Sequence, residues 1–356
     1  LVAAASKQSS KAINTFSIVF GEEEFDERKY SRMVADQYQT IHHEILIHPE
    51  ELIQGINKPL ELMDHPTIDG INTYFISQAV KNKGFKMAIS GTGSDELFAG
   101  YPVFKQAYSL NNKKWLFSFP PQIRNWTGKI IRTFDSSLKG EKIASIMNQR
   151  LLELPYYYPV FRRVFFDNSL RKLLKGDKSK FDNFPFTWGK ESLEFNSLNG
   201  NMPFLSKISI LEMETYLQNV LLRDADQMGM ANSLEIRVPF LDHELVSFIL
   251  SIRDEYKYPD TQKKILVDAT KGWLPDELVN RKKMGFVFPW DKWIKNELNS
   301  FCDQSLKLLK KSNLFDTNQV QSIWRNFMNG SNKVHWTSIW TLVVLSKWME
   351  INSFID

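Results

Sequence analysis

The stretch that decides the fold is Ala88-Ile89-Ser90-Gly91-Thr92-Gly93-Ser94-Asp95-Glu96-Leu97-Phe98-Ala99-Gly100-Tyr101. It follows the short apolar run 84–89, which predicts a buried strand. Glycines directly after a strand let backbone N–H groups approach a phosphate or an adenine ring, because no Cβ stands in the way. The start of the helix that follows favours an anion, and Asp95 offers carboxylate oxygens to a hard cation such as Mg²⁺. On its own, such a pattern is more often an ordinary Gly-rich turn, so the nucleotide interpretation needs support from elsewhere in the chain.

Two further stretches supply that support. One is the segment 221–243, which contains Asp226, Glu235 and the run Arg237-Val238-Pro239-Phe240-Leu241-Asp242. The other is Arg281-Lys282-Lys283-Met284-Gly285-Phe286, followed by Pro289 and Trp293. In this order, the three blocks resemble the SGxGxDE, DxxxMxxxxExRxPFLD and RxKxGF signatures of the asparagine synthase family, the ATP-pyrophosphatase amidotransferases. The resemblance covers nearly the whole chain and is weakest over 105–205.

The order of the expected elements favours an α/β fold. We expect strands over 13–20, over 42–48 and before Ser90, with helices between them over 26–38, 49–63 and 71–83. This alternation predicts a doubly wound, mostly parallel sheet with its ligand at the carboxyl ends of the strands. The resemblance implies the adenine nucleotide α-hydrolase-like (HUP) form of that sheet, with a large helical subdomain. Further helices are expected over 205–230, 245–252, 262–270, 293–309, 318–329 and 335–349.

The chain divides into three expected parts. Residues 1–104 form the nucleotide-binding α/β part, 105–205 a helical, aromatic-rich insertion, and 206–356 a helical C-terminal part that completes the synthetase site. The aromatic and basic residues of the insertion could stack on nucleic-acid bases. A helical core, or a surface for a partner, is the interpretation that we favour.

The amino-acid composition argues against several classes of function. The 356 residues carry 45 Lys+Arg and 41 Asp+Glu, and a net charge of +4 is too mild to indicate nucleic-acid binding. Basic pairs such as Lys263-Lys264 are expected on solvated faces. The sequence has one cysteine, Cys302, which fits a reducing cytoplasm. No apolar run reaches the length that spans a bilayer, so we expect a cytoplasmic protein with no membrane or nucleic-acid partner.

The resemblance assigns roles to residues around the Gly-rich stretch. It implies that ATP lies against the strand end at Ile18 and Val19 and against Ser90, Gly91 and Gly93, and that Asp95 binds Mg²⁺. The histidines at 42, 43 and 48 alternate between the two faces of a predicted strand. We therefore place no metal site there.

The other two blocks supply the catalytic candidates. Lys283 corresponds to the family lysine that stabilises charge on the phosphoryl groups, a role that suits a compact ammonium. Asp226 and Glu235 are candidates because of their positions in the second block. A buried Glu235–Arg237 pair that fixes the chain before Pro239 is an equally adequate explanation of that block.

The family adenylates a carboxylate and lets ammonia attack the acyl-adenylate, with AMP and pyrophosphate as products. The implied partners are aspartate or an analogue, ammonia, and an N-terminal glutaminase domain of the parent chain; a homodimer is left open. Asparagine-forming members usually carry an acid where this chain has Thr92, and threonine cannot act as a general base near neutral pH. We therefore treat Thr92 as a substrate-specificity residue and keep open an amidotransferase for another carboxylate or a lactam-forming relative.

The first residues carry one more expectation. Residues 1–7 predict a helix, and in the resembling family the corresponding helix follows an S-G-G-x-D-S loop that grips pyrophosphate. We expect that loop directly upstream in a longer protein, and we expect this chain alone to be inactive. Two rival functions are a tRNA-modifying pyrophosphatase, which the mild charge disfavours, and a catalytically degraded relative that binds a protein partner.

Overall fold

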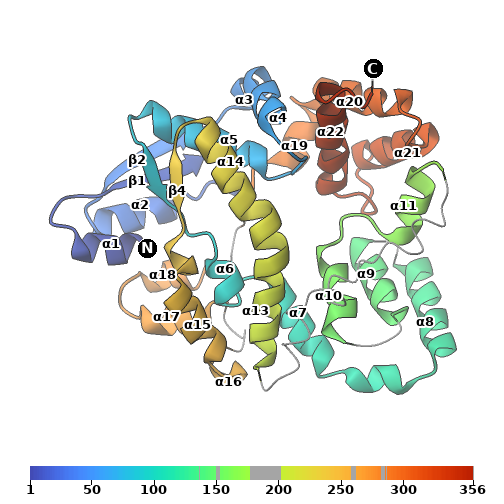
Figure 1. Ribbon diagram of the computed structural model, residues 1–356, viewed down its shortest axis with the longest axis horizontal. Coiled ribbons are helices and arrows are strands. Elements are labelled where there is room, and N and C mark those ends of the chain that lie inside the picture. Colours follow the sequence, from blue (N-terminus) through green and yellow to red (C-terminus); the bar gives the residue numbers. More distant parts are fainter. Residues whose placement is uncertain are drawn as a thin grey trace. The chain divides into compact units, whose positions relative to one another are not determined.

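The computed structural model describes residues 1–135, 137–149, 153–176, 202–257, 262–281, 285 and 287–355 (Figure 1). These residues form two compact units. The first unit contains Leu1–Gly100 and Leu211–Leu298, and the second contains Tyr101–Ile210 and Asn299–Asp356. The fold is mixed α/β: most of the described residues are helical, and the strands form two small parallel sheets.

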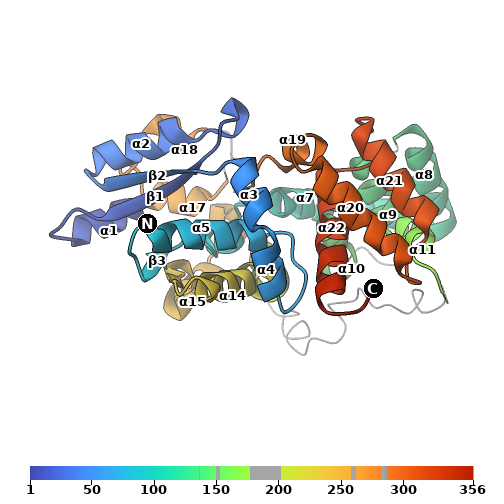
Figure 2. The same cartoon turned by 90° about the horizontal axis from the view of Figure 1, so that it is seen from above.

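Both sheets belong to the first unit. Strand β1 (Asn14–Val19) pairs with β2 (Ile41–Leu46) in a register that sets Asn14 opposite Ile41 and Val19 opposite Leu46. Parallel neighbours need a crossover connection, and α2 (Arg28–Gln37) provides it by packing on both strands (Figure 2). Strand β3 (Met87–Ile89) pairs with β4 (Glu235–Arg237). The predicted strands and their parallel direction are therefore confirmed, but the described residues form two separate strand pairs instead of one continuous sheet.

The connection from β2 to β3 consists of three helices. The single helix expected over 49–63 is wrong, because the chain forms α3 (Pro49–Gly55) and α4 (Asn57–Leu62) with a break at Ile56. Pro59 has no N–H to donate to the Gly55 carbonyl, so a helical hydrogen bond is missing at that point. Helix α5 (Gly70–Asn82) then leads into β3, as predicted.

The long helix expected over 205–230 is confirmed. It consists of α13 (Phe204–Glu212), a π-helical segment (Met213–Leu222) and α14 (Arg223–Ala231) in direct succession. Helix α14 packs beside α5 and against β4 (Figure 1). Gly229 permits this close approach, because a Cβ there would lie 2.8 Å from the Leu234 carbonyl oxygen and 3.1 Å from Ile236 Cδ1.

In the part of the chain that the structure describes, one face of the β3–β4 pair is covered and the other is open, which corrects the prediction that the strand before Ser90 is buried. Met87 and Ile89 are 42% and 56% exposed. Successive side chains of a strand point to opposite faces, so Met87 and Ile89 share the open face with Glu235 and Arg237. Ala88 and Ile236 point to the covered face, where α14 packs.

The remaining elements of the first unit are short. They are α1 (Val2–Gln8), a 3₁₀ turn (Glu23–Phe25), α6 (Ser94–Leu97), a 3₁₀ turn (Pro239–Leu241), α15 (His243–Ser251), α16 (Asp254–Lys257), α17 (Lys264–Ala269), α18 (Asp276–Val279) and α19 (Trp290–Lys295). Phe20, directly after β1, packs edge-to-face on Phe288 and Trp293, with ring centroids 5.3 and 5.9 Å apart. This aromatic cluster fixes the end of β1 to the segment that follows the third block.

The second unit is helical, as expected for the aromatic-rich insertion. Besides most of α13, its described elements are α7 (Pro102–Asn111), a 3₁₀ segment (Lys114–Ser118), α8 (Pro121–Phe134), α9 (Leu138–Met147), α10 (Leu154–Arg162), α11 (Asp167–Leu173), α20 (Asn299–Lys311), α21 (Thr317–Met328) and α22 (Trp336–Ile351). Helices α20, α21 and α22 pack on one another (Figure 2), with Trp340 of α22 fully buried. The expected helix over 293–309 is two helices, because Asn296 leaves the helical backbone region at φ −115° and ψ −94°. Across the described ranges, no helix is both long and apolar enough to cross a bilayer.

Candidate functional site

The Gly-rich stretch forms a tight turn at the carboxyl end of β3. The Ser90 N–H donates to the Arg237 carbonyl oxygen (2.8 Å), which closes the ladder with β4. The hydroxyls of Ser90 and Thr92 share a hydrogen bond of 2.7 Å, and the Thr92 N–H donates to Ser90 Oγ (3.2 Å). Gly93 adopts φ +91°, a conformation that favours glycine. A Cβ on Gly91 would meet none of the described atoms within 4 Å, so space is open beside the backbone there.

Asp95 lies in the first turn of α6 and faces a lysine from a distant part of the sequence. Lys263 Nζ lies 3.2 Å from Asp95 Oδ2 and donates to Ser94 Oγ (2.9 Å). The side chains of Asp95 and Lys263 are 23% and 26% exposed. The expectation that the Lys263-Lys264 pair lies on a solvated face is therefore wrong for Lys263; it holds better for Lys264, which pairs with Asp268 on the same helix.

Gly100 makes room for this pair of charges. A Cβ on Gly100 would overlap Asp95 Oδ1 and lie 2.8 Å from Lys263 Cε. The backbone reinforces the arrangement, because the Gly100 N–H donates to the Asp95 carbonyl oxygen (2.8 Å). The glycine at the end of the first block therefore protects the geometry of Asp95.

Gly100→Ala is expected to displace the Asp95 carboxylate and to destabilise the protein by about 1–3 kcal/mol, the usual cost of forcing extra atoms into a packed site. Chemical denaturation of the variant and the wild type measures this difference. Gly21→Ala is the matched control, because a Cβ on Gly21 meets no described atom within 4 Å. Equal stability of Gly100→Ala and the wild type would contradict the packing around Asp95.

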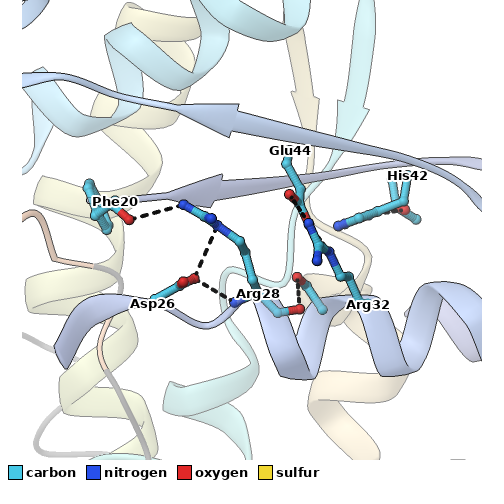
Figure 3. Close-up of polar contacts among 8 residues, drawn as sticks. Phe20, Asp26, Arg28, Arg32, His42 and Glu44 are labelled. Atoms are coloured by element: carbon cyan, nitrogen blue, oxygen red, sulfur yellow. Dashed lines mark hydrogen bonds and ion pairs between the residues drawn. The ribbon is translucent and has the colours of Figure 1, made fainter. Parts of the chain in front are cut away.

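The carboxyl end of β1, where Ile18 and Val19 are predicted to contact ATP, is bordered by an arginine that the sequence did not single out. Val19 is buried. Arg28 Nη2 donates to the Phe20 carbonyl oxygen (3.2 Å), and the Arg28 backbone N–H donates to Asp26 Oδ1 (2.9 Å) (Figure 3). Arg28 is the first residue of α2, and its side chain bends back to the residue after the strand. A guanidinium group is thus held at the strand end.

Figure 3 also shows an ion pair that holds α2 against β2. Arg32 Nη2 donates to Glu44 Oε2 of β2 (2.7 Å), and this hydrogen bond lowers the pKa of Glu44 (Figure 3). Thr15 of β1 stands opposite His42 of β2, and its hydroxyl lies 2.9 Å from His42 Nδ1. His42 and Glu44 therefore have structural partners.

Two carboxylates of the second block, Asp226 and Glu235, line one pocket. This pocket of about 260 Å³ lies at α14 and β4 and is lined by Leu222, Ala225, Asp226, Met230, Leu234, Glu235, Ile236 and Val238. Glu235 stands opposite Met87 at the amino end of the β3–β4 pair, whereas Ser90 follows its carboxyl end. A strand rises about 3.3 Å per residue, so roughly 10 Å of strand separates Glu235 from the level of the Gly-rich turn. Asp226 and Glu235 are brought together, but Glu235 does not lie at the strand end that carries Asp95.

The Glu235–Arg237 pair is formed but is not buried. Arg237 Nε lies 2.9 Å from Glu235 Oε1, and the two side chains are 60% and 57% exposed. Exposed ion pairs contribute about 0–1 kcal/mol, so the expectation of a buried pair that fixes the chain is wrong. Asp242 orders the chain after Pro239 instead, by accepting from the backbone N–H groups of Glu244 (3.0 Å) and Leu245 (3.2 Å) at the start of α15.

A buried aspartate that no local pattern singled out lies at the start of α14. Asp224 is 1% exposed, and Thr67 donates its hydroxyl to Asp224 Oδ1 (2.8 Å). Burial raises the pKa of Asp224 to about 7, and the charges of Asp69 and Asp64 add to the rise. Because α5 leads into β3 and α14 leads into β4, both helices begin on the side of the sheet where the parallel strands end. Asp224 therefore lies on the same side as the Gly-rich turn.

The third block is only partly described. Lys283 lies outside the described residues, as do Lys282, Met284 and Phe286. Arg281, just before them, forms an ion pair with Glu27 and lies over the ring of Tyr30, 4.8 Å from its centroid. Within the described ranges, no group of three or more His, Cys, Asp or Glu side chains converges on a metal position. Asp95 fits a cation nonetheless, since the ammonium of Lys263 already stands where a cation would contact Oδ2.

Comparison with known proteins shows what the chain resembles. Residues 1–350 match the family model described as Asparagine synthase. Asparagine synthetase [glutamine-hydrolyzing] 1 of Bacillus subtilis (strain 168) is 26% identical over 99% of this chain and 54% of that protein. A putative asparagine synthetase [glutamine-hydrolyzing] of Mycobacterium tuberculosis (strain ATCC 25618 / H37Rv) is 25% identical over 98% of this chain and 52% of that protein. Amidase chyE of Penicillium rubens is 25% identical over 64% of this chain and 36% of that protein. The chain thus spans about half the length of the asparagine synthetases that it matches.

Proposed function

Because this chain belongs to the asparagine synthase family, we propose that it is the synthetase part of an ATP-dependent ligase that joins ammonia to a carboxylate. The carboxylate is first adenylated, and ammonia then displaces AMP; pyrophosphate leaves in the first step. The observation that carries this proposal is the turn after β3, where the open backbone at Gly91 adjoins an aspartate that already holds a cationic group. Fixed donors and charges of this kind stabilise the charge that develops when the adenylyl group transfers to the carboxylate and pyrophosphate leaves.

In this proposal ATP lies along the carboxyl ends of β1 and β3. Ile18 and Val19 flank it on one side, and Ser90, Gly91 and Gly93 flank it on the other. The open space at Gly91 and the guanidinium of Arg28 beside the end of β1 support this placement.

Asp95 is the proposed Mg²⁺ ligand on this chain. Mg²⁺ takes six oxygen ligands and usually keeps several waters, so one protein carboxylate is compatible with a metal held mainly by phosphate oxygens. When bound, the cation neutralises charge on the polyphosphate. Lys283 would add a second positive charge at the phosphoryl groups.

The acceptor carboxylate is proposed to bind near Asp226, at the start of α14. Asp226 and Glu235 are proposed catalytic residues, and their common pocket supports a joint role. For Glu235 the support is the pocket alone, since this residue stands at the amino end of β4.

The doubly wound sheet is also a proposal. In the described residues, β1 and β3 each have one edge without a strand partner. The rings of Phe16 in β1 and Phe85 just before β3 lie 5.1 Å apart, which brings the two strand pairs close together. A parallel strand preceding α1 could pair with both edges and carry the S-G-G-x-D-S loop, since α1 would then form the crossover to β1.

We further propose the three functional parts 1–104, 105–205 and 206–356, and an N-terminal glutaminase domain in a longer parent protein as the source of ammonia. Relatives of about twice this length that are named glutamine-hydrolysing support the second point. A homodimer is left open. The one cysteine, Cys302, is a buried free thiol, which is compatible with a cytoplasmic location.

The experiment that tests the proposed function is exchange of labelled pyrophosphate into ATP by the full-length protein. Adenylation is reversible before ammonia attacks, so exchange should require both Mg²⁺ and a carboxylate substrate. Exchange that is absent with every carboxylate tried, in a protein that binds MgATP, would contradict adenylation. The 356-residue chain alone is expected to show no exchange.

Thr92 gives a prediction about the acceptor. If threonine marks a changed substrate, the wild-type protein forms little asparagine from aspartate, and Thr92→Glu raises that rate by up to roughly 10²–10⁴-fold, the usual contribution of a catalytic acid or base. Asparagine formed per minute at saturating MgATP and ammonium is the measurement.

Two control variants distinguish the effect of an acid at position 92 from an effect of the substitution on the shape of the loop. Thr92→Gln adds a side chain of similar length without an acid, and Thr92→Ser keeps the hydroxyl that bonds Ser90. Neither is expected to raise asparagine formation. Wild-type turnover on aspartate near one per second, in the range of ordinary enzymes, would rule out a changed substrate.

A further inference from the structure

Lys263 reaches the Asp95 site from a strained backbone. Its φ is +56°, in the left-handed region that costs a residue other than glycine roughly 1–2 kcal/mol. Strain of this kind persists where the surrounding structure requires it and is concentrated at functional sites. The strained residue directs its ammonium at Ser94 Oγ (2.9 Å) and Asp95 Oδ2 (3.2 Å).

The surroundings of this ammonium are packed and specific. Ser94 is buried, and Gly100 leaves just the space that the Asp95 carboxylate and Lys263 Cε occupy.

We propose that Lys263 is a positioning residue that stands in for the metal ion on Asp95 in the nucleotide-free protein and yields Asp95 when MgATP binds. This inference rests on the proposed function, because it takes Asp95 as the metal ligand. Mg²⁺ binds a carboxylate oxygen at 2.0–2.1 Å, and the ammonium already contacts Oδ2 of that carboxylate. Two cations repel each other at such a distance, so the metal must displace the ammonium.

Once displaced from Asp95, the ammonium of Lys263 needs another anion. Binding of the metal is therefore coupled to binding of the nucleotide. Without ATP, a metal ion that takes Asp95 leaves Lys263 with the neutral Ser94 hydroxyl as its other polar contact among the described residues, at 2.9 Å. With ATP, a phosphate oxygen can accept the ammonium in a charge-assisted hydrogen bond. Lys263 therefore weakens the binding of metal alone and favours the binding of metal together with nucleotide.

The test is a binding cycle on the full-length protein with Mn²⁺ as the metal probe and α,β-methylene-ATP as a nucleotide that cannot release pyrophosphate. Mn²⁺ affinity is measured by electron paramagnetic resonance with and without the nucleotide. In the wild type the nucleotide should raise Mn²⁺ affinity strongly. Lys263→Met, a neutral side chain of similar length, should bind Mn²⁺ alone more tightly and should reduce the metal–nucleotide coupling roughly 10-fold, within the usual range of coupling between sites.

Two further variants complete the design. Lys264→Met is the matched control, since Lys264 pairs with Asp268 on its own helix, and it should leave both affinities unchanged. Lys263→Ala also removes the charge, so it tests the proposal even if Lys263→Met does not fold, whereas Lys263→Arg keeps the charge and should retain most of the coupling. Lys263→Met or Lys263→Ala that folds and binds Mn²⁺ with wild-type coupling would overturn the role of Lys263. A wild-type protein that binds no Mn²⁺–nucleotide complex would overturn the proposed function as well, so the two failures are distinguishable.

Discussion

Replacing Asp95 by asparagine is expected to abolish carboxylate-dependent exchange of pyrophosphate into ATP, while glutamine hydrolysis by the full-length protein persists. The amide keeps the shape of the side chain but removes the charge that would hold Mg²⁺, and a cation bound to polyphosphate is needed before two anionic reactants can meet. Removing one group that stabilises transition-state charge costs about 10²–10³-fold in rate. We expect a loss of at least that size, measured as exchange per minute at saturating MgATP.

Asp268→Asn is the matched control for this variant. Asp268 also pairs with a lysine, Lys264, but the pair lies on one helix and the Asp268 side chain is 61% exposed. Its exchange rate should stay within about twofold of the wild type, because exposed ion pairs contribute little. Equal exchange by Asp95→Asn and the wild type would remove Asp95 from the metal site.

The second large effect concerns stability. Asp224→Asn is expected to stabilise the protein at pH 8–9 and to change its stability little near pH 4. The pKa of Asp224 is raised from 3.8 to about 7 in the folded protein, so the folded state binds more protons than the unfolded state between these values. Stability is therefore lost as the pH rises through this window and the buried carboxyl ionises. A rise of about three units corresponds to about 4 kcal/mol at most.

Thermal unfolding at pH 5 and pH 9 measures this effect. Asparagine can still accept the hydroxyl of Thr67 through its side-chain oxygen, so the packing is preserved. Asp226→Asn, two residues further along α14 and exposed, is the control for replacing a carboxylate by an amide on this helix. If Asp224→Asn shifts the melting temperature by the same amount at pH 5 and at pH 9, Asp224 does not titrate in this window.

Local patterns were sufficient for much of the first unit. The β-rich run at 13–20 and the alternation that follows it predict β1, α2 and β2, and the structure confirms these elements and their parallel pairing. Gly93 adopts a left-handed conformation in the turn after β3, a detail that was not predicted from the sequence. The break between α3 and α4 could also have been predicted, because Pro59 stands four residues after Gly55.

Other features depend on tertiary packing and leave no local signal. Lys263 stands in a pair of lysines that has the sequence of an ordinary solvated face, and only the fold brings it to Asp95. Asp224 differs from Asp226 through the contact with Thr67, which is distant in sequence. In a strand of three residues, alternation cannot tell which face is covered, so the exposure of Glu235 and Arg237 could not be foreseen.

The most direct test of the central claim is transfer of ¹⁸O from a labelled carboxylate substrate to AMP by the full-length protein. Adenylation joins a carboxylate oxygen to the α-phosphorus, and attack of ammonia on the carbonyl carbon leaves that oxygen on AMP. With ¹⁸O-labelled aspartate, or the carboxylate that supports exchange in its place, one ¹⁸O per amide formed should appear in the phosphate of AMP, detected by mass spectrometry. Amide formation with unlabelled AMP, or with ADP and labelled inorganic phosphate, would contradict an acyl-adenylate.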